Sequence, residues 1–95
     1  MIFNTGELFA GPGGGAYAAM TSRFVDEHDE EWGFKHAWAN EYDPDTVETY
    51  KLNILQDPNA TSVYCKDVRS FDLHDRNVLG DIDALIFGFP CNDYS

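Results

Sequence analysis

Strand-type and helix-type segments alternate along this chain, and that alternation limits the possible folds more than any other feature. The expected strands cover residues 2–9, 34–39, 62–65 and 84–89, and the expected helices cover residues 16–24, 43–52 and 71–79. Short connections between alternating strands and helices are typical of a parallel sheet with right-handed crossovers. The last strand is apolar on both faces, as in a strand covered by helices on each side. The sequence therefore predicts an α/β fold with a doubly wound parallel sheet of about four strands.

A glycine-rich turn joins the first expected strand to the first expected helix. Gly11, Gly13 and Ala16 fit the spacing G-x-G-x-x-G/A in the required context. Glycines let the backbone turn tightly and approach a ligand, while the helix N-terminus offers free N–H groups. The alternative is that this segment is merely a tight turn. No Gly-Lys-Ser/Thr sequence follows, so the turn is not a P-loop of the Walker A type.

The acid expected for ribose binding is Glu41, at the end of the second strand. It lies roughly 30 residues after Gly11, whereas a dinucleotide fold places it about 20 residues beyond the glycines. The acidic segment 26–31 accounts for the difference. A carboxylate in this place can accept both ribose hydroxyls of any adenosine-bearing cofactor, so the pattern leaves open which cofactor is bound.

The charge of the chain is strongly negative, with 17 acidic and 6 basic residues and a formal net charge of −11. Affinity for nucleic-acid phosphates comes largely from Lys and Arg, so this chain is not expected to bind DNA or RNA by itself. Five of the six residues 26–31 are acidic, and we expect them in a solvated loop or helix end. A hydrophobic content of 43% is enough for the core of one small domain.

The two cysteines lie in different segments and lack metal-ligand spacing, so no metal site is predicted. Cys65, inside an expected strand, is predicted to be a small core residue. Cys91 follows the last strand behind Pro90, where an open α/β sheet presents reactive groups. The histidines and tryptophans are expected at surface, strand-edge or packing positions: His28, His36, His74, Trp32 and Trp38. Without a basic leader or long apolar run, the expected location is the cytoplasm, with no membrane contact.

Four motifs resemble the cytosine-C5 DNA methyltransferase family, in the same order and over nearly the whole chain. Phe9-Ala10-Gly11-Pro12-Gly13-Gly14 looks like the first cofactor motif, and Asn40-Glu41-Tyr42-Asp43 looks like the second. Asp67-Val68 matches the acid after the third strand. Gly88-Phe89-Pro90-Cys91-Asn92-Asp93-Tyr94-Ser95 looks like the nucleophile motif, with Asn92 where Gln is commoner.

This resemblance implies a Rossmann-like fold that depends on S-adenosylmethionine, with residues 1–95 as its N-terminal cofactor-binding and nucleophile part. Glu41 would hold the ribose hydroxyls, and Tyr42 would pack on the adenine. Asp67 would accept from the adenine amino group beside the backbone of Val68. The cofactor-binding residues that the resemblance implies are Phe9, Ala10, Gly11, Gly13, Gly14, Glu41, Tyr42, Asp67, Val68, Phe89 and Pro90.

The same resemblance makes Cys91 the catalytic nucleophile. Thiolate addition at cytosine C6 makes C5 enamine-like, methyl transfer follows, and loss of the C5 proton releases the thiol. A free cysteine has a pKa of about 8.5, so the site must favour the thiolate. A target base in a duplex must also be flipped out of its stack. The resemblance leaves open whether the substrate is DNA or, as for one branch resembling this family, RNA. We expect DNA, in a restriction-modification setting, because DNA is the commoner substrate of this family.

The family's remaining parts, including the target-recognition region, lie beyond the nucleophile motif and are not found in this sequence. We therefore expect the chain to be inactive alone, as a fragment or as half of a split enzyme with a complementing chain. Strand 84–89 would then be an unpaired apolar edge that invites self-association. Two alternatives remain: a non-catalytic remnant that at most binds an adenosyl cofactor, and a nicotinamide-dependent Rossmann domain, which the cysteine motif and the Gly-to-Glu spacing disfavour.

Overall fold

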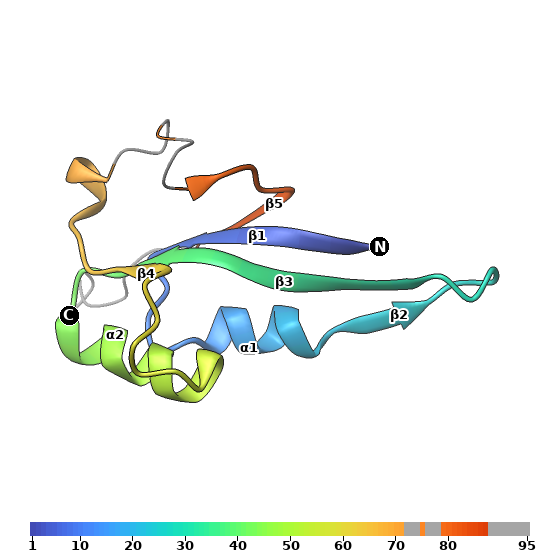
Figure 1. The fold of residues 1–95 in the computed structure, drawn as a ribbon, viewed down its shortest axis with the longest axis horizontal. Helices are drawn as coiled ribbons and strands as arrows, with labels where there is room; N and C mark the ends of the chain where they lie inside the picture. Colours follow the sequence, from blue (N-terminus) through green and yellow to red (C-terminus); the bar gives the residue numbers. More distant parts are fainter. Residues whose placement is uncertain (72–74, 76–78, 88–95) are drawn as a thin grey trace, which may run out of the picture.

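A computed structural model describes residues 1–71, 75 and 79–87 of this protein. Figure 1 shows a mixed α/β arrangement in which the long strands β1 and β3 run side by side. The elements, in chain order, are β1 (Ile2–Leu8), α1 (Gly14–Thr21), β2 (Arg23–Val25), β3 (Glu31–Asn40), α2 (Pro44–Tyr50), the π-helix η1 (Lys51–Leu55), β4 (Val63–Tyr64), the 3-10 helix η2 (Val68–Ser70) and β5 (Ala84–Phe87).

The sheet has the order β2-β3-β1-β5, and β4 also pairs with β3. Strands β1, β3, β4 and β5 pair with one another in parallel, which confirms the predicted parallel pairing. The register of β1 and β3 shifts between Thr5 and Gly6, where β3 carries one extra residue. That extra residue changes which side chains of β3 face each side of the sheet.

The short strand β2 is an addition that the sequence did not predict. Helix α1 ends at Thr21, whereas the prediction extended it to Phe24. The hydroxyls of Thr21 and Ser22 donate to the carbonyls of Tyr17 and Ala18 at 2.7 Å each, and the backbone then becomes extended. Strand β2 pairs antiparallel with the first residues of β3, so the expected helix end is wrong and a hairpin takes its place.

Helices α1 and α2 cover one face of the sheet and form the first hydrophobic core with it (Figure 1). Helix α2 begins as predicted, with Pro44 in its first turn and the Asp43 carboxylate accepting from the Thr46 amide at 3.2 Å. This core consists of Ala10, Ala16, Ala39, Val47, Tyr50 and Val63, with Met20, Ile54 and Leu55 packed against it.

The second core lies on the other face and is built around Trp38, which is only 3% exposed. Its indole packs over Gly6, where a Cβ atom would come within 2.3 Å of Trp38 Cζ2. Phe71 meets Trp38 edge-on at 5.4 Å between ring centroids. Most of the predicted helix over 71–79 lies outside the described residues.

Strand β5 is less covered than its apolar sequence predicted. Leu85 and Phe87 are 46% and 60% exposed, so the expectation that helices cover both faces is wrong for the described strand. Among the described residues β5 pairs only with β1, which leaves its other edge free. Strand β5 therefore has the sequence of a buried strand, but the described residues do not cover both of its faces.

Candidate cofactor and catalytic site

Three predicted site segments meet where parallel strands end. The carboxyl ends of β1, β3 and β4 lead into residues 9–15, 41–43 and 65–67 respectively, at the left of Figure 1. Open α/β sheets bind ligands at this edge, in the crevice outside the carboxyl ends of the strands. The fold thus brings together candidate residues that lie far apart in the sequence.

The glycine turn has left-handed backbone at three positions. Phe9 has φ +55°, a backbone conformation that residues other than glycine rarely adopt. Gly11 and Gly13 have φ +60° and +111°. A Cβ at Gly13 would come within 2.3 Å of Ile54 Cγ1, so this glycine allows the turn to press against η1. A Cβ at Gly11 or Gly14 would meet nothing within 4 Å, so the turn has open space there.

Glu41 connects this turn to the start of α2. Its carboxylate accepts from the Gly11 amide at 3.0 Å and from the Asp43 amide at 2.8 Å. The Glu41 amide in turn donates to the Tyr64 carbonyl of β4 at 3.0 Å. A carboxylate has about four lone-pair sites, so two remain to accept hydroxyl groups of a ligand.

Tyr42 and Cys65 are neighbours at the same edge of the sheet. The Tyr42 side chain is largely exposed, at 72%, which leaves its ring free to pack on a flat ligand. The Cys65 thiol donates to the Tyr42 carbonyl at 3.4 Å. Cys65 is exposed because β4 ends one residue earlier, so its predicted place in the core is wrong.

Asp67 caps the short helix η2 and pairs with Arg69. Its carboxylate accepts from the Arg69 amide at 2.9 Å and from Arg69 Nη2 at 2.6 Å. Hydrogen bonds from Arg69 lower the pKa of Asp67 to about 2. The group therefore stays ionised at neutral pH and can only accept hydrogen bonds, and Val68 follows it as the first residue of η2.

The sequence analysis did not predict a hydrogen-bonded group of buried and partly buried polar side chains beneath the site. The Tyr50 hydroxyl donates to Glu7 Oε1 at 3.0 Å and lies 3.3 Å from His36 Nδ1. His36 Nε2 lies 2.8 Å from the Ser62 hydroxyl. The sequence predicted only a surface, strand-edge or packing position for His36 and did not indicate these hydrogen-bond partners. Part of this group could have been anticipated from the sequence, because the alternation of side chains along a strand places the polar residues Thr5 and Glu7 on the same face of β1.

Glu7 lies directly under the start of α1. A Cβ at Gly15 would come within 3.0 Å of Glu7 Oε2, so the carboxylate contacts the helix that follows the glycine turn. Burial raises the pKa of Glu7, and the hydrogen bond from Tyr50 lowers it by a smaller amount. Burial, and then the nearby Glu7 charge, raises the pKa of Tyr50, while burial lowers the pKa of His36.

The family model described as C-5 cytosine-specific DNA methylase matches residues 3–95. The chain belongs to this methylase family. It is 47% identical to the Type II methyltransferase M.BbvI of Brevibacillus brevis over 100% of this chain and 26% of that protein. It is 34% identical to the Type II methyltransferase M.Bsp6I of Bacillus sp. (strain RFL6) over 93% of this chain and 22% of that protein. No solved structure matches.

This chain spans about a quarter of the length of these two methylase relatives. The three predicted site residues after β5, Phe89, Pro90 and Cys91, lie outside the described residues, although β5 runs toward the same edge of the sheet as β1. The described helices include none that is long and apolar enough to cross a membrane. The same described residues contain no cluster of three or more possible metal ligands.

Proposed function

We propose that this chain is the cofactor-binding and nucleophile part of a DNA (cytosine-5-)-methyltransferase. The enzyme to which it contributes would transfer a methyl group from S-adenosylmethionine to C5 of cytosine through a covalent Cys91 adduct, and this chain would be inactive alone. Membership of the methylase family supports the reaction class. The observation that carries the cofactor assignment is the position of Glu41, whose carboxylate is fixed beside the glycine turn at the sheet edge.

The residues at this edge fit an adenosyl cofactor. S-adenosylmethionine supplies a methyl group on a positively charged sulfur. Glu41 would hold the ribose hydroxyls with its free lone pairs, and the exposed Tyr42 ring would lie on the adenine. The open space at Gly11 and Gly14 would admit the rest of the ligand beside Phe9, Ala10 and Gly13.

Asp67 would accept from the adenine amino group, with the Val68 backbone beside it. Because Arg69 holds the Asp67 carboxylate, that carboxylate is already ionised before a ligand arrives. Either a free lone pair of Asp67 serves the adenine or the exposed Arg69 side chain moves away. Phe89 and Pro90 would border the cofactor from the segment after β5.

Catalysis would start at Cys91. Its thiolate would add to C6 of the cytosine, which makes C5 able to take the methyl group, and loss of the C5 proton would release the thiol. The substrate would be DNA, contacted mainly through parts of the enzyme outside this chain, because 17 acidic residues repel phosphate. A complementing segment would also pair with the free edge of β5 and extend the sheet into a doubly wound Rossmann-like fold, in a cytoplasmic enzyme.

A chimera with a relative tests this function directly. The segment of M.BbvI that matches this chain is replaced by residues 1–95, and methyl transfer to cytosine in DNA is measured. We expect activity that Cys91→Ser abolishes and that Cys65→Ser retains, because Cys65 is exposed and lies after a different strand. Activity that survives Cys91→Ser would overturn the nucleophile assignment.

The cofactor assignment is tested in the same chimera with two glutamates. Glu41→Ala should raise KM for S-adenosylmethionine about tenfold or more, because it removes hydrogen bonds to a charged acceptor. Glu48→Ala removes an exposed acid from α2 and should leave KM unchanged. A chimera that binds S-adenosylhomocysteine without methylating DNA would favour the non-catalytic remnant. Binding of NADH in place of S-adenosylhomocysteine would favour the nicotinamide-dependent alternative.

A further inference from the structure

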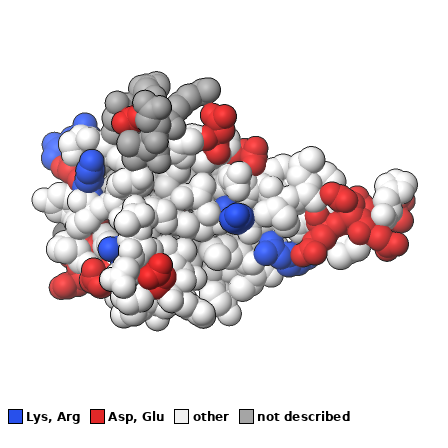
Figure 2. All heavy atoms as spheres, in the orientation of Figure 1, with Lys and Arg blue, Asp and Glu red and all other residues white. Residues whose placement is uncertain are grey.

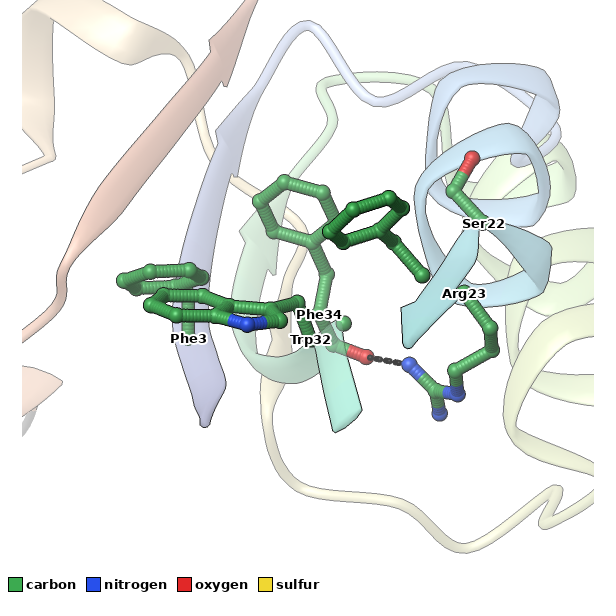
Figure 3. A pocket seen from close by; sticks show the side chains of 7 residues that line it. Phe3, Ser22, Arg23, Trp32 and Phe34 are labelled. Atoms are coloured by element: carbon green, nitrogen blue, oxygen red, sulfur yellow. Dashed lines mark hydrogen bonds between the residues drawn. The ribbon is translucent and has the colours of Figure 1, made fainter. Parts of the chain in front are cut away.

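An aromatic pocket lies at the opposite end of the sheet from the proposed cofactor site. The beginning of β1 and the β2–β3 hairpin form an arm that extends past α1 (Figure 1). The pocket on this arm has a volume of about 160 Å³. Its lining, shown in Figure 3, consists of Phe3, Ser22, Arg23, Phe24, Trp32, Gly33 and Phe34.

Aromatic rings form most of this pocket. The Phe3 ring lies 5.8 Å from the Trp32 ring and 5.9 Å from the Phe34 ring, centroid to centroid. Phe24 pairs with Trp32 across β2 and β3 and is 63% exposed. Helix α1 ends at Thr21, and the chain continues beside these rings as the extended strand β2. Apolar cavities of about 150 Å³ hold a benzene ring, so this pocket can receive a large apolar side chain.

The acidic segment 26–31 forms the tip of the arm beside the pocket, and Figure 2 shows its carboxylates gathered at the right. Asp26 fixes its shape, because its carboxylate accepts from the amides of His28 at 2.8 Å and Glu30 at 3.0 Å. The same carboxylate accepts from Trp32 Nε1 at 3.0 Å. The acidic tip and the aromatic pocket are therefore held together by one side chain.

Few positive charges neutralise this tip. The N-terminal amine pairs with Glu30 at 2.7 Å, and Arg23 pairs with Glu31 at 3.4 Å. Glu27 and Asp29 have no Lys or Arg partner within the described residues. A fixed patch of uncompensated acid beside an apolar pocket selects a ligand that is both basic and apolar.

We propose that the aromatic pocket and the acidic tip together bind a basic, amphipathic polypeptide segment. A large apolar side chain of that segment fills the pocket, and its Lys or Arg side chains meet Glu27 and Asp29. Charge repulsion disfavours two other classes of occupant. A second copy of this chain carries a net charge of −11 and the same acidic tip, and phosphate groups of lipids or nucleic acids would be repelled.

The indole N–H signals of the two tryptophans provide a test in the 95-residue chain by nuclear magnetic resonance. Trp32 lines the pocket, whereas Trp38 is buried in the second core and serves as an internal control. The chain is titrated with a helical peptide of Leu and Lys. We expect the Trp32 signal to shift saturably while the Trp38 signal stays in place.

Two control peptides separate the apolar and electrostatic contributions. A Ser and Lys peptide lacks the anchor, and a Leu and Glu peptide reverses the charge. We expect each to bind at least about tenfold more weakly than the Leu and Lys peptide. Equal binding by either control peptide would overturn the proposal. A shift of the Trp32 signal when the chain is concentrated without peptide would also overturn it, because the occupant of the pocket would then be a second copy of the chain.

Variants of the chain locate the binding surface. Phe24→Ser removes an exposed side chain from the wall of the pocket and should weaken binding of the Leu and Lys peptide about tenfold. The double variant Glu27→Gln and Asp29→Asn should weaken it and reduce the salt dependence of binding. Leu52→Ser removes a similarly exposed apolar side chain from η1 and should change nothing. Unchanged affinity in Phe24→Ser would place binding elsewhere and overturn the proposal.

Discussion

At the scale of single residues, Glu7 is a carboxylate buried in the protein interior, an environment that its type normally avoids. It is 5% exposed and has a hydrogen bond from Tyr50, yet burial raises its pKa. A raised carboxyl pKa means that the native state favours the protonated form. The corresponding stability is present at acidic pH and is lost as the pH rises through the native-state pKa.

Glu7→Gln should therefore increase the free energy of unfolding at neutral pH by about 1 kcal/mol or more, because it removes a buried charge and keeps an acceptor for Tyr50. Urea unfolding between about pH 4 and pH 8 measures the difference from the unmodified chain. The difference should shrink toward acidic pH. A difference that stays constant with pH would contradict this account.

Some residues of the candidate site can be predicted from their neighbours in the sequence, and others cannot. The Asp43 cap is visible in the sequence because spacing and turn chemistry determine it. The group of Glu7, His36 and Tyr50 was missed because its contacts join positions up to 43 residues apart. Which polar side chain becomes buried depends on where α2 packs on the sheet, and no local pattern carries that information.

At the scale of elements, the parallel strands were predicted and the β2–β3 hairpin was not. The short continuous apolar run of β5, and the strand-type residues of β1 that stop at the glycine-rich turn, identify these two strands locally. The hairpin depends instead on Asp26, whose carboxylate accepts from two backbone amides and one indole. Such side-chain to backbone bonds favour a turn over a helix, so the acidic run closes the hairpin between β2 and β3.

Asp26→Ala should loosen the hairpin without unfolding the sheet. Amide hydrogen exchange should accelerate at the paired residues 23–25 and 31–33 and stay unchanged where β1 pairs with β5, because only the hairpin loses hydrogen bonds. Glu27→Ala removes the same charge from the same turn and is the matched control. Equal acceleration in both variants would show that charge, and not the Asp26 hydrogen bonds, determines the effect.

At the scale of the whole molecule, the free edge of β5 favours self-association of the chain and its negative charge opposes it. Strand β5 presents a free edge among the described residues, and Leu85 and Phe87 are exposed beside it. Unpaired apolar edges pair readily with other strands. The net charge of −11 makes copies of the chain repel one another, and this repulsion weakens as salt screens it over a Debye length of about 10 Å at 0.1 M.

We therefore predict association that increases with both chain concentration and salt, measured by sedimentation velocity. The double variant Leu85→Lys and Phe87→Lys should remain monomeric, because each lysine replaces apolar contact area with a charge. Leu52→Lys places the same charge on an exposed residue of η1 and should associate like the unmodified chain. Association that falls with salt would identify charge pairs instead of the β5 edge as its cause. Loss of association in the Leu52 variant alone would place the contact on η1.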